Sequence, residues 1–286
     1  MSNLKGKIDF VVVVSATNAN PNGDPLNGNR PRENYEGYGE ISDVCIKRKI
    51  RNRFQDLGQK VFVQSDERSD DGFLSLKERA DGCEKLAKEI KNGKRANKEA
   101  CAEIACEEWL DVRAFGQVFA FKGSDVSLGI RGPVSIHQAV SCSPVDIIST
   151  QITKSVNSEP GKEGKASDTM GMKHRIGFGL YLIKGSVNVQ LAEKTGFSQE
   201  DADILKESLK TLFENDASSA RPEGSMEVCD LYWWQHNDKT PAVSSAKIHR
   251  SILVKALNER PKSYDDYEIT LKPIEGCVKA EEYHFV

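Results

Sequence analysis

The stretch that decides the fold runs from residue 8 to residue 25 and reads Ile8-Asp-Phe-Val-Val-Val-Val-Ser-Ala-Thr-Asn-Ala-Asn-Pro-Asn-Gly-Asp-Pro25. The segment from Ile8 to Ser15 is rich in β-branched residues and predicts a buried first strand. Turn-forming residues then crowd Thr17 to Pro25 and predict an ordered loop. Loops that follow a buried strand often present polar groups to ligands, so Asn20 and Asn22 are candidate binding residues. The same residue types also close tight turns, and both interpretations stay open here.

A basic helix is expected after this loop, with Ser42 or Asp43 as its N-cap and its end near Gly58. At about 100° per residue its apolar side chains form one stripe that faces the core: Ile46, Ile50, Phe54 and Leu57. Its cations crowd the remaining surface: Lys47, Arg48 and Arg51, with Lys49 and Arg53 beside the apolar stripe. Only Asp43 and Asp56 lie within the helix to neutralise them. We therefore expect these cations to bind an external polyanion rather than to face only solvent.

The rest of the chain predicts an α+β fold with long insertions. Helices are expected at Leu74–Lys91, Lys98–Leu110, Ser198–Phe213 and Ile248–Asn258, and strands at Phe115–Phe121, Val126–Val140, Asp146–Val156, Ile176–Val189 and Tyr267–Lys272. Residues 157–165 have the composition of a linker, which predicts a hairpin that projects from the sheet. A split βαβ core of the RRM-like type would suit this order, and other α+β topologies remain open.

Composition favours a packed cytoplasmic protein. The chain has 286 residues, 38% of them hydrophobic and 29% charged. The longest early apolar run, Phe10 to Val14, is too short to span a bilayer, so we expect no membrane association. Seven cysteines without a CxxC pair predict reduced thiols, and the dispersed histidines predict neither a metal site nor a cofactor. The net charge of −3 requires that any polyanion site be a local basic surface.

Several segments together resemble one protein family. Asn20-Pro-Asn-Gly-Asp-Pro25 and Ser42-Asp-Val-Cys-Ile-Lys-Arg-Lys-Ile-Arg-Asn52 are similar to the opening of the CRISPR-associated Cascade backbone subunit of type I-C. Later segments resemble that family in the same order: Asp111-Val-Arg-Ala-Phe-Gly116, Ile130-Arg-Gly-Pro-Val134, Ile152-Thr-Lys-Ser155, Thr169-Met-Gly-Met-Lys-His174 and Gly179-Leu-Tyr181. The resemblance covers most of the chain up to about residue 190.

The resemblance implies a hand-shaped, noncatalytic protein without a cofactor. It implies one RRM-like (ferredoxin-like) palm over 1–286, a helical insertion at about 59–111 as fingers, and a β-hairpin thumb at about 152–176. Copies would stack as a helical filament along CRISPR guide RNA, contact other Cascade subunits, and present the guide for pairing with target DNA.

The resemblance also implies which residues bind RNA. Lys47 and Arg51 match the palm-helix cations that hold guide phosphates, with Arg48 adjacent and Ser42 at the helix mouth. Arg131 lies in a glycine-rich strand bend, and Lys154 lies where the thumb leaves the sheet. The returning thumb segment supplies Met170, Met172, Lys173, His174 and Arg175. A Met can act as an apolar wedge that displaces a base, while Lys173 and Arg175 hold the flanking phosphates. The family carries Arg at the positions of Lys154 and Met172.

Three other classes of protein compete with this hypothesis. A metal-dependent RNA-cleaving backbone subunit would use carboxylates, and the candidates are Asp24, Asp43, Asp125 and Asp168, which form no DxD or HxD pair. A cysteine enzyme would use Cys45, which sits at the edge of the apolar stripe like a buried thiol. A solitary RNA-binding protein could stack bases on Trp233 and Trp234, but adjacent Trp residues are more often core anchors, and the strands lack aromatic RNP signatures.

Overall fold

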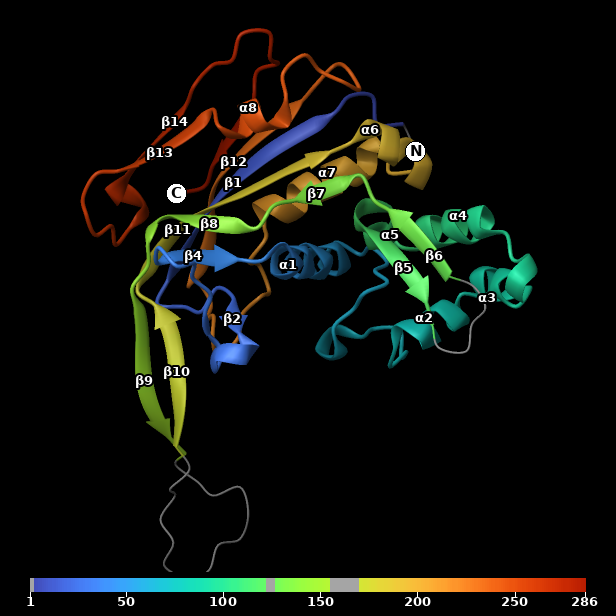
Figure 1. Ribbon diagram of the computed structural model, residues 1–286, viewed down its shortest axis with the longest axis horizontal. Coiled ribbons are helices and arrows are strands. Elements are labelled where there is room, and N and C mark those ends of the chain that lie inside the picture. Colours follow the sequence, from blue (N-terminus) through green and yellow to red (C-terminus); the bar gives the residue numbers. More distant parts are fainter. Residues whose placement is uncertain (1–2, 122–126, 155–169) are drawn as a thin grey trace, which may run out of the picture.

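The fold is built on a seven-stranded antiparallel sheet, seen in a computed structural model that describes residues 3–121, 127–154 and 170–286 (Figure 1). The strands follow the order β15-β12-β1-β11-β8-β4, and β7 also pairs with β11. Their bounds are β1 Ile8–Thr17, β4 Tyr38–Ile41, β7 Val134–Ile136, β8 Ala139–Pro144, β11 Phe178–Val187, β12 Met226–Gln235 and β15 Glu281–His284. The predicted first strand is confirmed as β1, which lies at the centre of the sheet because its β-branched residues are buried on both faces.

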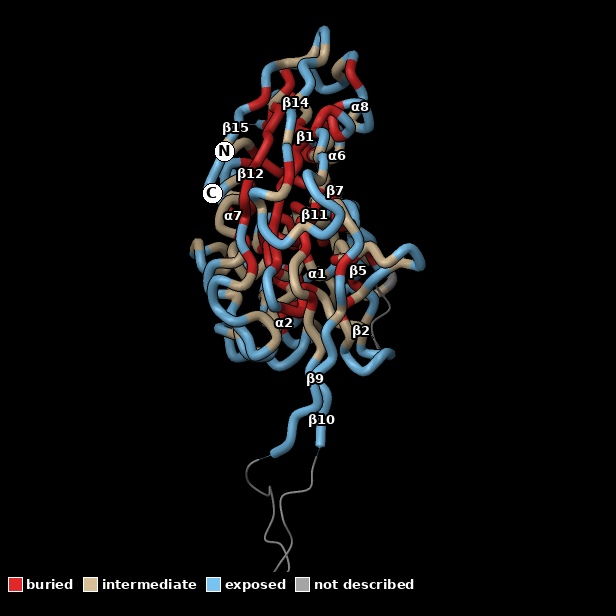
Figure 2. The backbone as a smooth tube through the Cα atoms, turned by 90° about the vertical axis from the view of Figure 1, so that its left-hand side faces the viewer, coloured by how far each residue is buried: buried red, intermediate tan, exposed pale blue. Residues whose placement is uncertain are grey.

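Alternate residues of β1 enter two different cores. Val12 and Val14 pack beneath helices α1 (Asp43–Asp56), α6 (Val189–Thr195) and α7 (Gln199–Lys210). Val11 and Val13 pack beneath α8 (Ser245–His249) and the hairpin of β13 (Ile252–Ala256) and β14 (Tyr267–Leu271). Figure 2 shows the buried strands as a red centre between these two layers. The sheet is therefore covered on both faces, with helices on one and a β-hairpin with a short helix on the other.

Trp233 and Trp234 on β12 belong to these two cores. Trp233 stacks on Phe10 with ring centroids 5.6 Å apart, and Trp234 packs near Tyr232 in the opposite layer. Both indoles are almost completely buried. Their interpretation as core anchors is confirmed, and neither offers an exposed face on which a base could stack.

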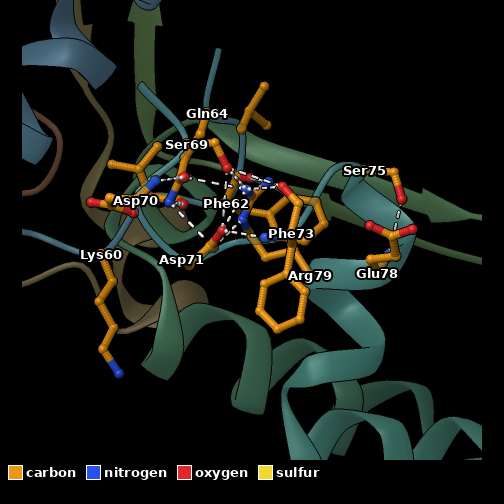
Figure 3. Close-up of polar contacts among 12 residues, drawn as sticks. Lys60, Phe62, Gln64, Ser69, Asp70, Asp71, Phe73, Ser75, Glu78 and Arg79 are labelled. Atoms are coloured by element: carbon orange, nitrogen blue, oxygen red, sulfur yellow. Dashed lines mark hydrogen bonds and ion pairs between the residues drawn. The ribbon is translucent and has the colours of Figure 1, made fainter. Parts of the chain in front are cut away.

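A helical unit with its own core lies beside α1 (Figure 1). It comprises α2 Leu76–Gly82, α3 Glu84–Ile90, α4 Lys98–Glu108, α5 Leu110–Phe115 and the hairpin of β5 Gly116–Ala120 and β6 Ser127–Arg131. Its centre is aromatic, with the Phe62 ring 4.7 Å from Trp109 and 5.0 Å from Phe119. The buried Arg79 fastens the irregular segment before α2, donating to Asp71, Gln64 and the carbonyl groups of Phe62 and Phe73 (Figure 3).

A second hairpin, β9 (Ile147–Thr153) with β10 (Met170–Ile176), extends away from the sheet (Figure 1). Most of its side chains are exposed, and both strands appear pale blue in Figure 2. Of the thumb predicted at about 152–176, residues 155–169 lie outside the described residues. Among the described residues, no helix has the length and apolar character needed to cross a bilayer.

Several element boundaries differ from the prediction. The helix expected at Leu74–Lys91 is two helices, because Cys83 between them takes an extended backbone conformation. The helix expected at Lys98–Leu110 ends at Glu108, because Trp109 takes an extended backbone conformation and separates α4 from α5. The helix expected at Ile248–Asn258 is wrong, since α8 ends at His249 and β13 follows. In β13 alternate residues are buried, which is the period of a strand rather than of a helix.

Candidate nucleic-acid interface

The loop after β1 is fastened to the start of α1. Ser42 is the N-cap, and its hydroxyl accepts a hydrogen bond from the Cys45 backbone N–H at 3.3 Å. Asn22 supports this cap, because its Oδ1 accepts both the Ser42 backbone N–H and the Ser42 hydroxyl at 2.9 Å. Asn20 is 2% exposed, and its amide donates to the Asn29 carbonyl at 2.7 Å. These side chains hold the loop in shape, and the buried Asn20 presents no surface to a ligand.

The predicted stripe of α1 is buried at Ile46, Ile50 and Phe54, whereas Leu57 is half-buried. Cys45 lies against the same core, and burial raises the pKa of its thiol despite the nearby cations Lys49 and Arg221. A raised pKa keeps the thiol protonated and weakly nucleophilic. All seven cysteines of the chain are free.

The expectation that the cations of α1 lack acidic partners is wrong. Within the helix Lys47 pairs with Asp43 at 3.0 Å, and Arg53 pairs with Asp56 at 2.8 Å. Partners also come from distant parts of the chain, since Arg51 Nε donates to Asp111 at 2.8 Å and Lys49 pairs with Asp216. Arg48 instead donates to the Val63 carbonyl oxygen at 2.6 Å. The sequence hid these partners because contacts over 60 to 167 positions depend on the fold.

These contacts hold the predicted RNA-binding cations in place without fully enclosing them. The Lys47 side chain is 23% exposed and the Arg51 side chain 12% exposed. Arg131, at the end of β6, is exposed, and it pairs in register with Gly116, the residue that follows Phe115. Within the described part of the chain the Arg131 guanidinium has no ion pair or hydrogen bond. The helical unit thus brings one more cation beside the basic side of α1.

The predicted thumb residues lie on both faces of the β9–β10 hairpin. Met170, Met172 and His174 alternate with Lys173 and Arg175 along β10. The two Met side chains are 64% and 53% exposed. Lys154 follows β9 directly and is exposed, at the end of the hairpin far from the sheet, because the hairpin already leaves the sheet at Ile147. The prediction that Lys154 lies where the thumb leaves the sheet is wrong. An exposed Met pair on an extended hairpin is costly in water and is typical of a surface that meets a partner.

The loop between the two regions contacts both. It contains β2 (Gly23–Asp24) and β3 (Arg30–Pro31). Arg30 donates to the Ser149 hydroxyl on β9 at 3.0 Å, and that hydroxyl lies 2.8 Å from His174 Nδ1 on β10. At the other end of the loop, Asn22 holds Ser42 on α1. The loop therefore links the N-terminus of α1 to the base of the hairpin through side-chain hydrogen bonds.

Comparison with known proteins places this arrangement in a family. A family model described as CRISPR-associated protein Cas7 matches residues 6–272 of the chain. The chain belongs to the Cas7 family. A curated Cas7 protein of Haloferax volcanii is 27% identical over 219 residues, a match that covers 69% of this chain. The chain spans 61% of that relative's length.

Two solved chains are also similar to this Cas7 family member. One comes from a structure described as a CRISPR RNA-guided surveillance complex, pre-nicking, with a TM-score of 0.49 and 18% identity, covering 79% of this chain and 75% of that one. The other comes from a CRISPR RNA-guided surveillance complex, with a TM-score of 0.46 and 16% identity, covering 79% of this chain and 68% of that one.

The carboxylates considered for metal-dependent cleavage have other contacts in this Cas7 chain. Asp24 accepts the Leu26 backbone N–H at 3.2 Å and pairs with Arg32 at 3.3 Å. Asp43 pairs with Lys47 on α1. Asp125 and Asp168 lie outside the described residues. Within residues 3–121, 127–154 and 170–286, no group of three or more His, Cys, Asp and Glu side chains could hold a metal ion.

Two contributors to the candidate interface were not predicted from the sequence. Arg30 links the loop to the hairpin, and Asp111 holds Arg51. Asp111 falls inside the segment Asp111-Val-Arg-Ala-Phe-Gly116 that carries the family resemblance, which was the one signal that pointed to it. Its role was invisible otherwise, because an aspartate at the start of a short helix usually interacts with the helix dipole.

Proposed function

We propose that this Cas7 family member is the guide-RNA-binding backbone subunit of a type I-C CRISPR surveillance complex. The observation that carries the proposal is a set of three cations on α1, Lys47, Arg48 and Arg51, which partners within the protein hold in position and which stay partly exposed. Copies stack as a helical filament along the guide, contact other Cascade subunits, and present the guide to target DNA. The cytoplasm is where such a complex would meet invading DNA.

Phosphate binding fits the basic side of α1. Lys47 and Arg51 are four residues apart, so they lie one helical turn from each other on the same surface. Arg48 has a neutral backbone partner and therefore keeps its full positive charge. Guide spacers differ in base sequence, but their phosphates all carry the same charge. Side chains that contact only phosphates therefore position RNA without reading its sequence. This is what a subunit that accepts any guide requires.

The hairpin fits the role of a thumb that extends over the guide. Met170 and Met172 would act as the apolar wedge that displaces a base, and Lys173 with Arg175 would hold the phosphates beside it. His174 and Arg30 lie near the base of the same hairpin, and Lys154 lies at its far end. The hairpin's exposure supports this role, because these side chains have little to pack against within one copy.

An RRM-like palm is supported by the central strand order β12-β1-β11-β8, in which all neighbours are antiparallel. Helix α1 lies between β1 and β8 in the chain, and α7 lies between β11 and β12. This is the βαββαβ order of a ferredoxin-like core. The unit of α2 to α5 within the predicted insertion at about 59–111 then forms the fingers, and the β9–β10 hairpin within about 152–176 forms the thumb.

We also propose that the subunit is noncatalytic and needs no cofactor. The ion pairs of Asp24 and Asp43 with Arg32 and Lys47 support this, because each carboxylate already has a cation of the protein as its partner. The check is incubation of the purified complex with guide RNA, complementary RNA and Mg²⁺. Intact RNA is expected, and cleavage at regular intervals would contradict the noncatalytic role.

The proposed function is tested by expressing the chain with two guides of equal length and unrelated spacers. We expect helical particles of the same size by electron microscopy with both guides. Affinity should be equal at fixed ionic strength and should fall as salt rises. Large differences between spacers would contradict phosphate-based binding, and isolated subunits on a full-length guide would contradict the filament.

A further inference from the structure

We propose that Asp111 is a positioning residue, which aims the Arg51 guanidinium at a phosphate instead of merely neutralising it. This inference rests on the proposed function, because it concerns how one cation of α1 is prepared for the guide. A carboxylate beside a polyanion site appears at first to weaken that site. The geometry around Asp111 indicates the opposite effect.

Asp111 is completely buried at the start of α5. Its Oδ1 accepts the Phe62 backbone N–H at 2.7 Å, and its Oδ2 accepts the Val63 backbone N–H at 3.1 Å. The same Oδ2 accepts Arg51 Nε at 2.8 Å. Two backbone donors therefore fix the orientation of the Asp111 carboxylate. The carboxylate in turn fixes the position of the Nε edge of the Arg51 guanidinium. The bond to Asp111 uses Nε, and the two terminal nitrogens of Arg51 make no hydrogen bond to this carboxylate.

The ring of Phe115 supports the guanidinium from a second direction. The Arg51 Cζ lies 5.1 Å from the Phe115 ring centroid, within the range of a cation–π contact. Phe115 is braced by the fully buried Phe54, with ring centroids 6.1 Å apart. A planar guanidinium held at one edge and over one face has lost most of its rotational freedom before any ligand arrives.

The terminal nitrogens of Arg51 stay available to a ligand. Among the residues that the structure describes, neither of them has a hydrogen-bond partner, and neither is buried without one. Arg48 is fixed by the same segment, because it donates to the carbonyl oxygen of Val63, whose N–H binds Asp111. The segment from Phe62 to Val63 and Asp111 thus sets two neighbouring cations of α1 at once.

The sign of one measurement separates positioning from neutralisation. Asp111→Asn removes a negative charge near the proposed phosphate site, so electrostatics alone predicts tighter binding of guide RNA. Positioning predicts weaker binding, by about tenfold, the usual value of one charge-assisted hydrogen bond. Asp81→Asn is the matched control, since Asp81 pairs with Lys77 at the surface of α2, outside the candidate interface. Its affinity for guide RNA should be unchanged.

A double-mutant cycle shows whether Asp111 acts through Arg51. Arg51→Ala should weaken guide RNA binding, and adding Asp111→Asn to it should cause no further loss. A full additional loss in the Arg51→Ala background would overturn the inference. If Arg51→Ala binds like wild type, the phosphate role of α1 fails and the inference fails with it. If only Asp111→Asn binds like wild type or tighter, the inference alone is overturned.

Arg51→Lys provides a second variant that leaves Asp111 and its backbone contacts in place, in case Asp111→Asn does not fold. Lysine keeps the charge, but its three donors share one nitrogen, so it cannot bind Asp111 and also present the planar pair of donors that a guanidinium offers to a phosphate. Positioning predicts a loss close to that of Arg51→Ala, whereas wild-type affinity for Arg51→Lys would overturn the inference. Lys239→Arg changes a surface cation that pairs with Glu193 outside the candidate interface; it is the control and should bind like wild type. Thermal melting of each full-length variant reports its folding.

Discussion

The basic side of α1 and the β9–β10 hairpin carry similar residues in opposite physical states. Each cation of α1 is held by a partner within the protein, as Arg51 is by Asp111. On the hairpin, Met170 and Met172 are more than half exposed, and Arg175 donates to the Thr150 hydroxyl at 3.5 Å. The helix is prepared before a ligand arrives, whereas the hairpin offers surface that only a partner can cover.

This difference has a cost on each side. Ordering a long cation before binding removes most of the entropy loss from the binding step, which favours affinity. An exposed Met pair loses that advantage but adapts its shape to whatever it meets. Under the proposed function, a subunit that binds every guide in the same way and also contacts a neighbouring copy benefits from having both. The predictions below test how firmly each region is tied to the fold.

The largest effect on stability is expected at Lys49, the buried cation of α1. Its ammonium group pairs with Asp216 and lies 5.3 Å from the Phe213 ring centroid. Burial lowers the pKa of Lys49, and Asp216 opposes that change. Lys49→Ala leaves the buried Asp216 with Arg221 alone and should cost about 3–5 kcal/mol of unfolding free energy.

Lys47→Ala is the matched control for this prediction. Its pair with Asp43 lies at the surface within one helix, so the loss should be at most about 1 kcal/mol. Urea unfolding of both variants measures the difference. Equal destabilisation would show that Lys49 is not a structural cation and that the two sides of α1 do not differ.

A smaller effect is expected from acid at the C-terminal end of α1. Burial raises the pKa of Asp56, but hydrogen bonds from Arg68 and Arg53 outweigh it and hold the pKa below its usual range. A lowered carboxylate pKa stabilises the folded state above about pH 4, and this contribution is lost as pH falls through the folded pKa.

Asp56→Asn should therefore lower the unfolding free energy by on the order of 1 kcal/mol at pH 7 and by less at pH 3. Melting temperatures across this pH range measure the change. The described strands of the hairpin contain no carboxylate, so hairpin variants should follow the wild-type pH curve. A difference in melting temperature between Asp56→Asn and wild type that stays constant at all pH values would contradict this link between the pKa of Asp56 and stability.

The smallest effect on stability is expected at the hairpin. Replacing Met170 and Met172 together with Ala should change the unfolding free energy by no more than about 0.5 kcal/mol, because both side chains are exposed. Met226→Ala is the control, since Met226 is buried and its loss should cost about 2–5 kcal/mol. Although its stability should hardly change, the variant with both Met170 and Met172 replaced should form shorter filaments on a guide RNA. Strong destabilisation would show that the Met pair packs within one copy.

The sequence predicted those features that local pattern determines. The β-branched run made β1, and the apolar spacing of Ile46, Ile50 and Phe54 set the buried side of α1. The pattern failed where a tertiary contact decided the outcome. The acidic partners Asp111 and Asp216 lie far along the chain from α1, so the basic helix looked unneutralised.

Element boundaries failed for a related reason. The segment after α8 looked helical because it is short and mixed, but β13 became a strand through pairing with β14 and packing on the sheet. For the candidate interface, residue types on α1 and β10 were identifiable from the sequence, but their state was not. Whether a cation is held or free depends on groups that only the folded chain brings near it.

The most direct test of the account is the salt dependence of guide RNA binding by the double variant Lys47→Ala/Arg51→Ala. Each lost phosphate contact should reduce the slope of log affinity against log salt by about 0.7, so two lost contacts should reduce it by about 1.4 per bound copy. A matched control, Lys77→Ala/Lys239→Ala, removes two surface cations that pair with Asp81 and Glu193 elsewhere and should keep the wild-type slope. A folded Lys47→Ala/Arg51→Ala protein with the wild-type slope and affinity would contradict the assignment of α1 as the phosphate-binding helix.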